Sequence, residues 1–418
     1  MANPCALACS NLGAALVIVL FASLARAQPR EVPERPGWLL APSFRVAPVY
    51  EDNVLFTPEP LESWLLRITP RLDAFYSRDS SRFEGGYTFD AERYPQEFAT
   101  LNDAFARQEG YAELRKLLNR RSSLVVRGTF LSTSRADEVL QDSGLLSLRR
   151  RSRSIVGNAL FTRAVRRRLS WTVGYGASLR DFVVPVGAKP RLGGVMHSLV
   201  TGFSLRHSVR TTSGWNYAFR LFVQEDLPEL TTPINEFATH VATYRWSRSV
   251  SRKTDLVLSL GPRFSDGLRF TEGDNGGFEK VRDVAPEIFA SFVYRGDGKF
   301  FSAQYNRTQA QAYGLSGFVD SENAIVTVLF EFGPRFRIEA NPGIYRNRRA
   351  GITTNSYQSN LTVEYEIASW ASIESSYIFQ YQDRLLAIVD GGVEATDDGI
   401  TRNTVWFGIR LFDLYAKK

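Results

Sequence analysis

The chain has 418 residues, of which 44% are hydrophobic and 13% aromatic, and its net charge is +7. Its two cysteines, Cys5 and Cys9, both lie close to the start. The remainder of the chain therefore cannot form a disulfide or a cysteine-based metal site. The aromatic content exceeds what a small soluble core needs and favours a protein with an apolar outer surface, with a large soluble β protein as the alternative.

The first 27 residues are expected to be a signal peptide that is removed. Leu12–Leu24 is almost wholly apolar, and Ala25-Arg26-Ala27 supplies an A-x-A cleavage site. The apolar run has about 13 residues, which suits a signal sequence and falls short of a membrane helix. No Lys or Arg precedes it, so the usual cationic start is missing. Residues 28–37 are then a periplasmic leader, and residues 38–418 form one domain.

Beyond the leader, apolar and polar side chains alternate almost to the end of the chain. Such alternation gives strands with one apolar and one hydrated face. The segments run about 10–15 residues, longer than most soluble strands and suited to a tilted membrane span. The apolar faces include Leu66, Ile68, Leu72 and Tyr76 in an early segment, Trp215, Tyr217, Phe219 and Leu221 in a central one, and Tyr357, Leu361, Val363 and Tyr365 in a late one.

Short and long connections alternate between these segments and predict about eighteen strands, with 16 as the lower bound. The short connections are expected near Ser77–Ser81, Asn119–Arg121, Val165–Arg168, Ser208–Gly214, Arg248–Lys253, Arg295–Gly298, Gly333–Arg335 and Ala368–Trp370. The long ones are expected near Glu51–Leu61, Pro95–Asn102, Ala136–Leu146, Pro185–Gly194, Asp226–Asn235, Ser265–Arg282, Gly314–Ser321, Ala350–Thr354 and Ala387–Ile400. The fold predicted is all-β, a single antiparallel transmembrane β-barrel with short periplasmic turns and long extracellular loops.

Charged residues divide in the same way. Acidic residues such as Glu51, Asp52 and Glu59 belong to a long connection, and Arg166–Arg168 belong to a short one. Arg supplies 44 of the 51 basic residues, and many Arg residues alternate with apolar residues along the expected strands. This arrangement is typical of a barrel rather than of a basic groove, so no nucleic-acid partner is expected.

The polar faces carry charges of both signs that would point into the barrel. One interpretation is a charged pore that selects solutes, and the other is cross-strand pairing that neutralises the charges, for example of Arg337 with the strand of Glu364 and Glu366. The candidate pore-lining residues are Arg67, Arg71, Asp73, Glu84, Asp90, Arg220, Arg263, Arg337, Glu339, Glu364, Glu366, Glu374 and Arg410.

Catalytic and metal chemistry have little support in the sequence. The three histidines are His197, His207 and His240. Adjacent strand residues point to opposite faces, so His197 and Ser198 cannot form a catalytic pair. The glycine-rich run Gly273–Gly277 suits a loop tip better than a calcium site. We therefore expect no enzyme, no cofactor and no metal, and a hydrolase embedded in the barrel is the least favoured hypothesis.

Two stretches resemble a known family. The first expected strand, Phe44–Val54, ends in Tyr50-Glu51-Asp52-Asn53-Val54, and Thr69–Leu72 reads Thr-Pro-Arg-Leu. Together they are similar to the β-barrel porins of proteobacteria that are often encoded with exopolysaccharide systems. Trp406–Tyr415 is similar to the terminal strand recognised during outer-membrane assembly, although three residues follow the aromatic Tyr415. The resemblance implies an outer-membrane barrel.

The leading hypothesis is a porin-like channel in the bacterial outer membrane, for hydrophilic solutes or for export of an exopolysaccharide. A barrel of eighteen strands is wide enough for water unless loops fill it. The alternative is a barrel that does not conduct and serves as an anchor, an adhesin or an assembly partner. Expected partners are outer-membrane lipid and lipopolysaccharide, the barrel-assembly machinery and polysaccharide-secretion components.

Overall fold

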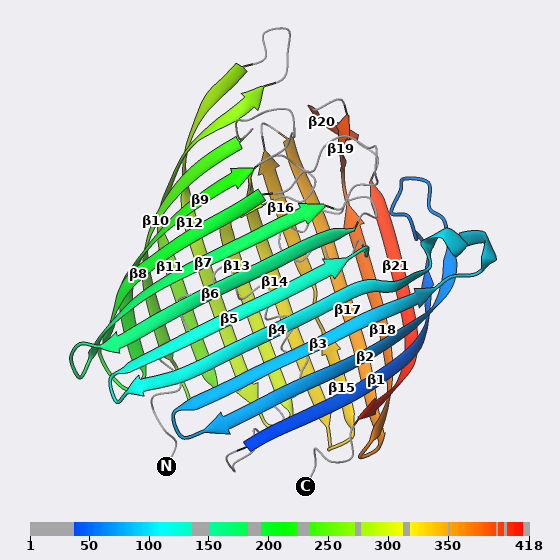
Figure 1. The fold of residues 1–418 in the computed structure, drawn as a ribbon, viewed down its shortest axis with the longest axis horizontal. Helices are drawn as coiled ribbons and strands as arrows, with labels where there is room; N and C mark the ends of the chain where they lie inside the picture. Colours follow the sequence, from blue (N-terminus) through cyan, green and yellow to red (C-terminus); the bar gives the residue numbers. More distant parts are fainter. Residues whose placement is uncertain are drawn as a thin grey trace.

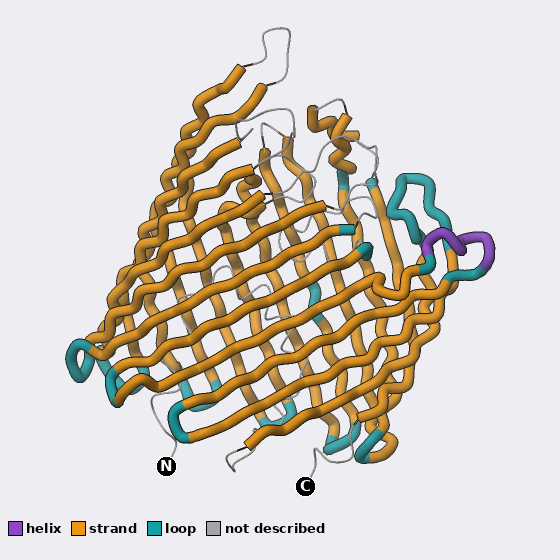
Figure 2. The backbone as a smooth tube through the Cα atoms, in the orientation of Figure 1, coloured by secondary structure: helices purple, strands orange, loops and turns teal. Residues whose placement is uncertain are grey.

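The chain folds into one large β-barrel whose strands tilt across its wall (Figure 1, Figure 2). The computed structural model describes residues 37–135, 151–182, 194–224, 235–271, 277–311, 318–349, 352–389, 392–396 and 399–412. The signal peptide expected over residues 1–27, most of the leader, residues 273–276 of the glycine-rich run and the C-terminal Tyr415 lie outside these residues.

The first half of the wall runs from β1 to β10. Its strands are β1 (Gly37–Glu51), β2 (Ser63–Arg78), β3 (Ser81–Arg93), β4 (Asp103–Asn119), β5 (Ser122–Thr133), β6 (Ser152–Ala164), β7 (Leu169–Phe182), β8 (Gly194–Arg206), β9 (Thr211–Gln224) and β10 (Asn235–Ser249). A short 3-10 helix, η1 (Gln96–Leu101), lies between β3 and β4.

The second half runs from β11 to β21. Its strands are β11 (Thr254–Thr271), β12 (Gly277–Gly296), β13 (Lys299–Gln311), β14 (Phe318–Phe332), β15 (Phe336–Ala340), β16 (Gly343–Arg349), β17 (Ile352–Ala368), β18 (Ala371–Gln382) and β21 (Ile400–Phe412). A separate hairpin of β19 (Leu385–Val389) and β20 (Gly392–Thr396) lies between β18 and β21.

The barrel is closed by its first and last strands. β1 pairs antiparallel with β2 and, from Ser43↔Phe412 to Glu51↔Thr404, also with β21. β15 and β16 are two parts of one strand, because both pair with β14 and with β17. The interruption contains Pro342, which has no N–H to donate to a neighbouring strand. The nineteen strand elements of the wall therefore make eighteen strands, and the predicted fold is confirmed.

The eight predicted short turns all join paired neighbouring strands, whereas two of the long connections were predicted wrongly. Residues 265–282 are mostly strand, since β11 and β12 pair from Ser265↔Asp283 to Thr271↔Gly277. Likewise β16 ends at Arg349 and β17 begins at Ile352, which leaves two residues of the predicted connection 350–354. Where a hairpin extends past the membrane, both faces meet water, so the alternation of side chains disappears while the backbone pairing continues.

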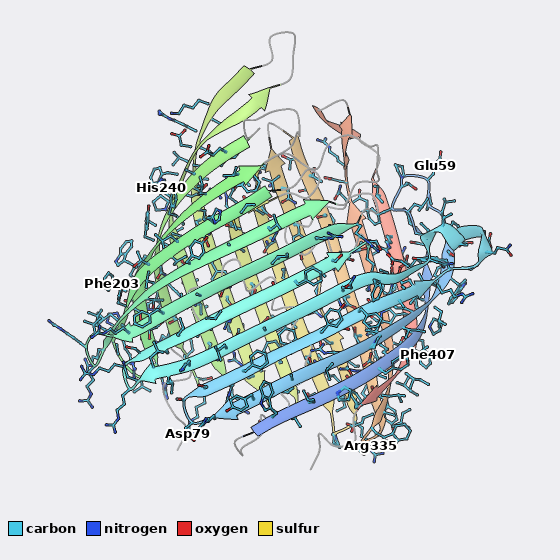
Figure 3. All side chains as sticks on the ribbon, viewed as in Figure 1. Glu59, Asp79, Phe203, His240, Arg335 and Phe407 are labelled. Atoms are coloured by element: carbon cyan, nitrogen blue, oxygen red, sulfur yellow. The ribbon has the colours of Figure 1, made fainter. Side chains whose placement is uncertain are left out.

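The outer surface of the barrel is apolar. Trp38 is 65% exposed, Trp215 63% and Trp64 60%. Phe203 and Phe407 also project from the outside of the ribbon (Figure 3). A soluble protein rarely exposes so continuous an apolar surface. The geometry is therefore that of a wall facing hydrocarbon, with polar residues inside. Within the residues that the structure describes, no helix is long and apolar enough to cross a membrane.

The two rims differ in charge. Arg166, Arg167 and Arg168 are exposed in the turn between β6 and β7, while Glu59 is exposed in the loop between β1 and β2. Figure 3 shows Glu59 at the opposite rim from Asp79 and Arg335, which lie at short turns. In the turn before β11, the Lys253 ammonium donates to Asp297 over 3.0 Å. This hydrogen bond raises the pKa of Lys253 above its ordinary value.

Candidate functional site: the inner face of the barrel

Strand alternation places the candidate residues on the inner face. On β2, Arg67 and Asp73 are buried, whereas Leu66 and Leu72, which directly precede them, are exposed on the outside. The same alternation holds where the other candidates lie. The inner face thus carries Arg67, Arg71, Asp73, Glu84, Asp90, Arg220, Arg263, Arg337, Glu339, Glu364, Glu366, Glu374 and Arg410. Whether they line an open pore stays a prediction.

A buried ionic network crosses the closure of the barrel. Arg67 on β2 donates to Glu92 on β3 over 2.7 Å and 2.9 Å and lies 3.5 Å from Glu51 on β1. Arg402 on β21 reaches the same Glu51 oxygen over 2.8 Å. All four side chains are at least 95% buried. Four strands, β21, β1, β2 and β3, are therefore linked by charges that water barely reaches.

Below this network lies a charged cavity of about 230 Å³. Eight of the predicted residues line it, namely Arg67, Arg71, Asp90, Arg337, Glu339, Glu364, Glu374 and Arg410. In its wall, Asp90 accepts hydrogen bonds from Thr69 over 2.5 Å and from Arg135 over 2.8 Å. Glu374 lies 3.0 Å from Arg410 and 3.6 Å from Arg45. The wall therefore contains cross-strand pairs, one of the two interpretations that the sequence left open, and charge selection stays a prediction.

The pairing of Arg337 differs from the example expected from the sequence. Arg337 lies directly opposite Glu364 in the strand register. Its ion pair, however, is with Glu339 on its own strand, over 2.8 Å. Residues i and i+2 share one face of a strand, so Glu339 offers a carboxylate without crossing to the neighbour. Glu364 in turn lies opposite the second carboxylate Glu374.

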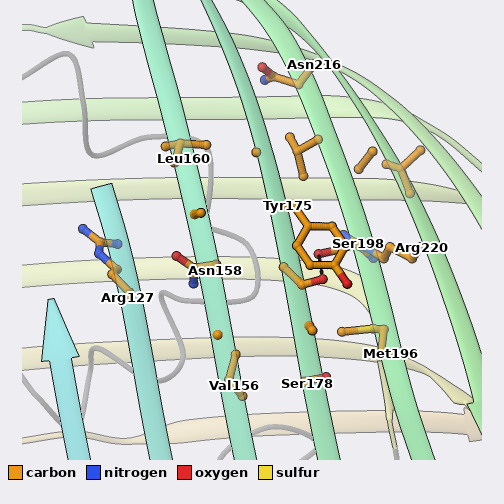
Figure 4. A pocket seen from close by; sticks show the side chains of 18 of the residues that line it. Arg127, Val156, Asn158, Leu160, Tyr175, Ser178, Met196, Ser198, Asn216 and Arg220 are labelled. Atoms are coloured by element: carbon orange, nitrogen blue, oxygen red, sulfur yellow. Dashed lines mark hydrogen bonds between the residues drawn. The ribbon is translucent and has the colours of Figure 1, made fainter. Parts of the chain in front are cut away.

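The opposite wall holds a second cavity, of about 170 Å³, with a different character (Figure 4). It is lined by small and apolar residues of β5–β10, among them Val156, Leu160, Met196, Val200 and Val241. Glycines bring the chain close here, because a Cβ on Gly174 would lie 2.7 Å from Leu160 and one on Gly176 would lie 2.6 Å from Ser198. Polar groups enter at the edge, where Arg220 donates to Glu287 over 3.3 Å.

Several inner charges escaped the sequence analysis. They are Arg45, Glu51, Glu92, Arg107, Glu109, Arg135, Glu287, Asp320 and Arg402. For Arg45 the signal was present, because it alternates with the outward Phe44 and Val46. For Arg107 and Glu109 the signal was absent, because their neighbours Gln108 and Gly110 carry no apolar side chain that would mark the outer face. Loop residues such as Arg135 follow no alternation.

The histidines make ordinary hydrogen bonds in the wall and its turns. His197 and His240 are exposed on the outside and bond to the hydroxyls of Tyr175 (2.8 Å) and Tyr217 (2.7 Å). Figure 3 shows His240 projecting from the outer side. His207 bonds to Ser213 over 2.7 Å. Among the described residues, no group of three or more His, Cys, Asp or Glu side chains could hold a metal.

Closed antiparallel pairing, an apolar exterior and a charged interior define the protein class as a membrane-spanning β-barrel. No protein-family model matches the chain, and no curated protein matches its sequence. The expected membership of the porin family associated with exopolysaccharide systems therefore stays a prediction.

Solved structures match the chain over most of its length. OpdL of Pseudomonas aeruginosa is 12% identical, with 90% of this chain and 99% of that one covered and a TM-score of 0.41. OccAB4 of Acinetobacter baumannii is 9% identical, with coverages of 92% and 100% and a TM-score of 0.43. The copper transporter OprC is 8% identical, with coverages of 91% and 84% and a TM-score of 0.43. At identities this low, the comparison says nothing about which solutes this chain takes.

Proposed function

We propose that the chain is an outer-membrane channel for small hydrophilic solutes. The charged cavity carries the proposal, because it lies inside a closed wall and is lined by side chains of both signs from β1–β4, β15, β17, β18 and β21. Such a wall attracts ions and hydrated solutes, whereas an anchor needs no charged interior. The membrane partners proposed are outer-membrane lipid and lipopolysaccharide, with the barrel-assembly machinery acting during insertion.

Export of an exopolysaccharide, with secretion components as partners, is the narrower form of this proposal. Its support is the sequence resemblance of Phe44–Val54 and Thr69–Leu72. Deleting the gene and measuring secreted polysaccharide tests it, and unchanged secretion would leave only the general channel.

The orientation of the barrel can be tested with cysteine variants. Residues 37–418 contain no cysteine, so an introduced thiol reports alone. We expect Glu59→Cys, in the exposed loop between β1 and β2, to react with an impermeant maleimide on intact cells. Arg252→Cys, in an exposed short turn, should react only after the outer membrane is permeabilised. The reverse labelling pattern would mean that the long loops face the periplasm.

Ion selectivity tests the channel itself. The lining of the charged cavity carries a net charge of +2, from seven arginines and five acids. The arginines are Arg45, Arg67, Arg71, Arg107, Arg135, Arg337 and Arg410, and the acids are Asp90, Glu109, Glu339, Glu364 and Glu374. We expect a conducting barrel with a preference for anions at low salt, measured as the reversal potential under a KCl gradient. Glu364→Gln should strengthen this preference, and about 1 M salt should remove it because screening shortens to roughly 3 Å.

Asp79→Asn is the matched control, because it also removes one carboxylate but lies in an exposed turn. It should leave the reversal potential unchanged. A purified, folded barrel that never conducts would end the channel proposal and favour the anchor. Conduction without any effect of Glu364→Gln would mean that this carboxylate is neutralised by its surroundings.

A further inference from the structure

The wall of the barrel is split between β12 and β13. The two strands pair from Gly296↔Lys299 up to Ile288↔Arg307 and no further. Beyond that point Gly277–Glu287 of β12 pairs with β11 alone, and Thr308–Gln311 of β13 pairs with β14 alone. The β11–β12 hairpin therefore continues along the wall, while the β13–β14 hairpin leaves it.

Pro286 explains where the pairing stops. It lies directly opposite Pro262 on β11. Two prolines can face each other only at a pair without backbone hydrogen bonds, so the nitrogen of Pro286 points towards β13. The N–H of Arg295 agrees with this, because it bonds to Lys253 on the β11 side, which leaves the even-numbered residues of β12 facing β13. Pro286 is the next residue of β12 that faces β13 beyond Ile288, and it has no N–H to donate to that strand.

The split lies at membrane depth. Outward side chains of β12 are apolar or aromatic from Val284 to Tyr294, a row about as tall as the roughly 25 Å apolar band of such barrels. The outward charges begin above Val284, where Lys280 and Arg282 lie 3.5 Å and 3.7 Å from Asp266. Pro286 is the second outward residue below that boundary, so the split opens in the outer half of the band.

Side chains bridge the split where the backbone does not. Thr308 donates to Glu287 over 2.7 Å, and Arg263, which is 99% buried, lies 3.0 Å from Asp320. Gln309 would face Pro286 if the pairing continued, but its side chain accepts hydrogen bonds from Thr239 on β10 and Ser265 on β11. The end of β13 is thus turned into the lumen, and polar contacts hold it there.

Backbone edges at membrane depth occur only where protein or a water-filled cavity covers them. The edge at Pro286 adjoins the second cavity of the lumen, because Glu287, Phe289 and Asn306 beside the split all line it. That cavity has apolar walls and is bordered by three arginines, Arg127, Arg220 and Arg245. Arg127 also pairs with Glu113 and Arg220 with Glu287. The cavity's 170 Å³ exceeds the 150 Å³ or so of a cavity that holds benzene.

We propose that the split between β12 and β13 is a lateral passage by which a small amphipathic anion moves between the lumen and the outer leaflet. The apolar part of the solute fits the walls formed by β5–β10, and its anionic group fits the arginines. Opening requires that the side-chain contacts of Thr308, Gln309 and Asp320 across the split separate, while no backbone pairing between β12 and β13 has to break. The inference rests on the proposed channel function and extends it to a second route.

Pro286→Val tests the passage without touching the lumen, because this side chain is exposed on the outside. Valine restores the missing N–H and allows β12 to pair with Gln309. In proteoliposomes, uptake of radiolabelled octyl sulfate should fall by about tenfold, since two added backbone hydrogen bonds favour the closed wall. Uptake of inorganic sulfate and ion conductance should stay unchanged. Pro262→Val is the matched control, an exposed proline on the same hairpin that faces β10, and should change none of the three.

A disulfide gives a second, reversible closure. Glu287→Cys combined with Thr308→Cys should slow octyl sulfate uptake when oxidised and restore it on reduction, even if Pro286→Val folds poorly. Octyl sulfate uptake that neither closure slows, or a loss of sulfate and octyl sulfate uptake together, would overturn the lateral passage. Absence of sulfate uptake and of conductance in the wild-type protein would instead overturn the channel function on which the passage rests.

Discussion

Replacing Arg67 with Met is expected to lower the free energy of unfolding by about 3–5 kcal/mol. Arg67 bonds to Glu92 and lies beside Glu51, and none of these side chains is more than 5% exposed. Methionine fills much of the volume but leaves the Glu92 carboxylate without its cation in a place that water hardly reaches. The midpoint of urea unfolding in liposomes measures the loss.

Arg337→Met is the matched control. Arg337 also pairs with a glutamate, Glu339, but it borders the charged cavity and is 15% exposed. Solvent can replace its partner there, so the expected cost is below about 1 kcal/mol. Equal losses in the two variants would mean that water reaches the Arg67 network and that the closure of β21 on β1 depends on backbone pairing alone.

Leu260→Arg is expected to destabilise the barrel by about 2–4 kcal/mol, because its side chain meets hydrocarbon near the midplane. Leu260 is 59% exposed and occupies the middle of the outward row of β11 from Leu256 to Phe264. Unfolding from liposomes by denaturant gives the difference from the wild-type protein.

Ser259→Arg places the same charge one residue away on the inner face, where Ser259 borders the second cavity. Glu287 lines the same cavity and offers the new charge a carboxylate, so this variant should cost less than Leu260→Arg. A larger loss for Ser259→Arg would contradict the assignment of the apolar face to lipid.

The alternation of side chains by itself determined most of the wall. Each strand meets lipid on one side and the lumen on the other, so the two environments select different types of side chain at neighbouring residues such as Leu66 and Arg67. Turn formation likewise depends on the residues of the turn itself, so connections such as Val165–Arg168 were predicted at the right places. Fold class, strand number and the part of the inner face that alternates with apolar residues therefore follow from the sequence alone.

Only the tertiary structure decided which side chains and strands pair with each other. It also decided how far strand pairing continues beyond the membrane, where both faces of a strand meet water. Pairing continued through Ser265–Thr271 because backbone hydrogen bonds do not need an apolar face. The partner of Arg337 was Glu339 rather than Glu364 because distances between side chains depend on the packing of the lumen. The split beside Pro286 became visible only from the register of three strands, since a proline by itself does not reveal which neighbour loses the hydrogen bond.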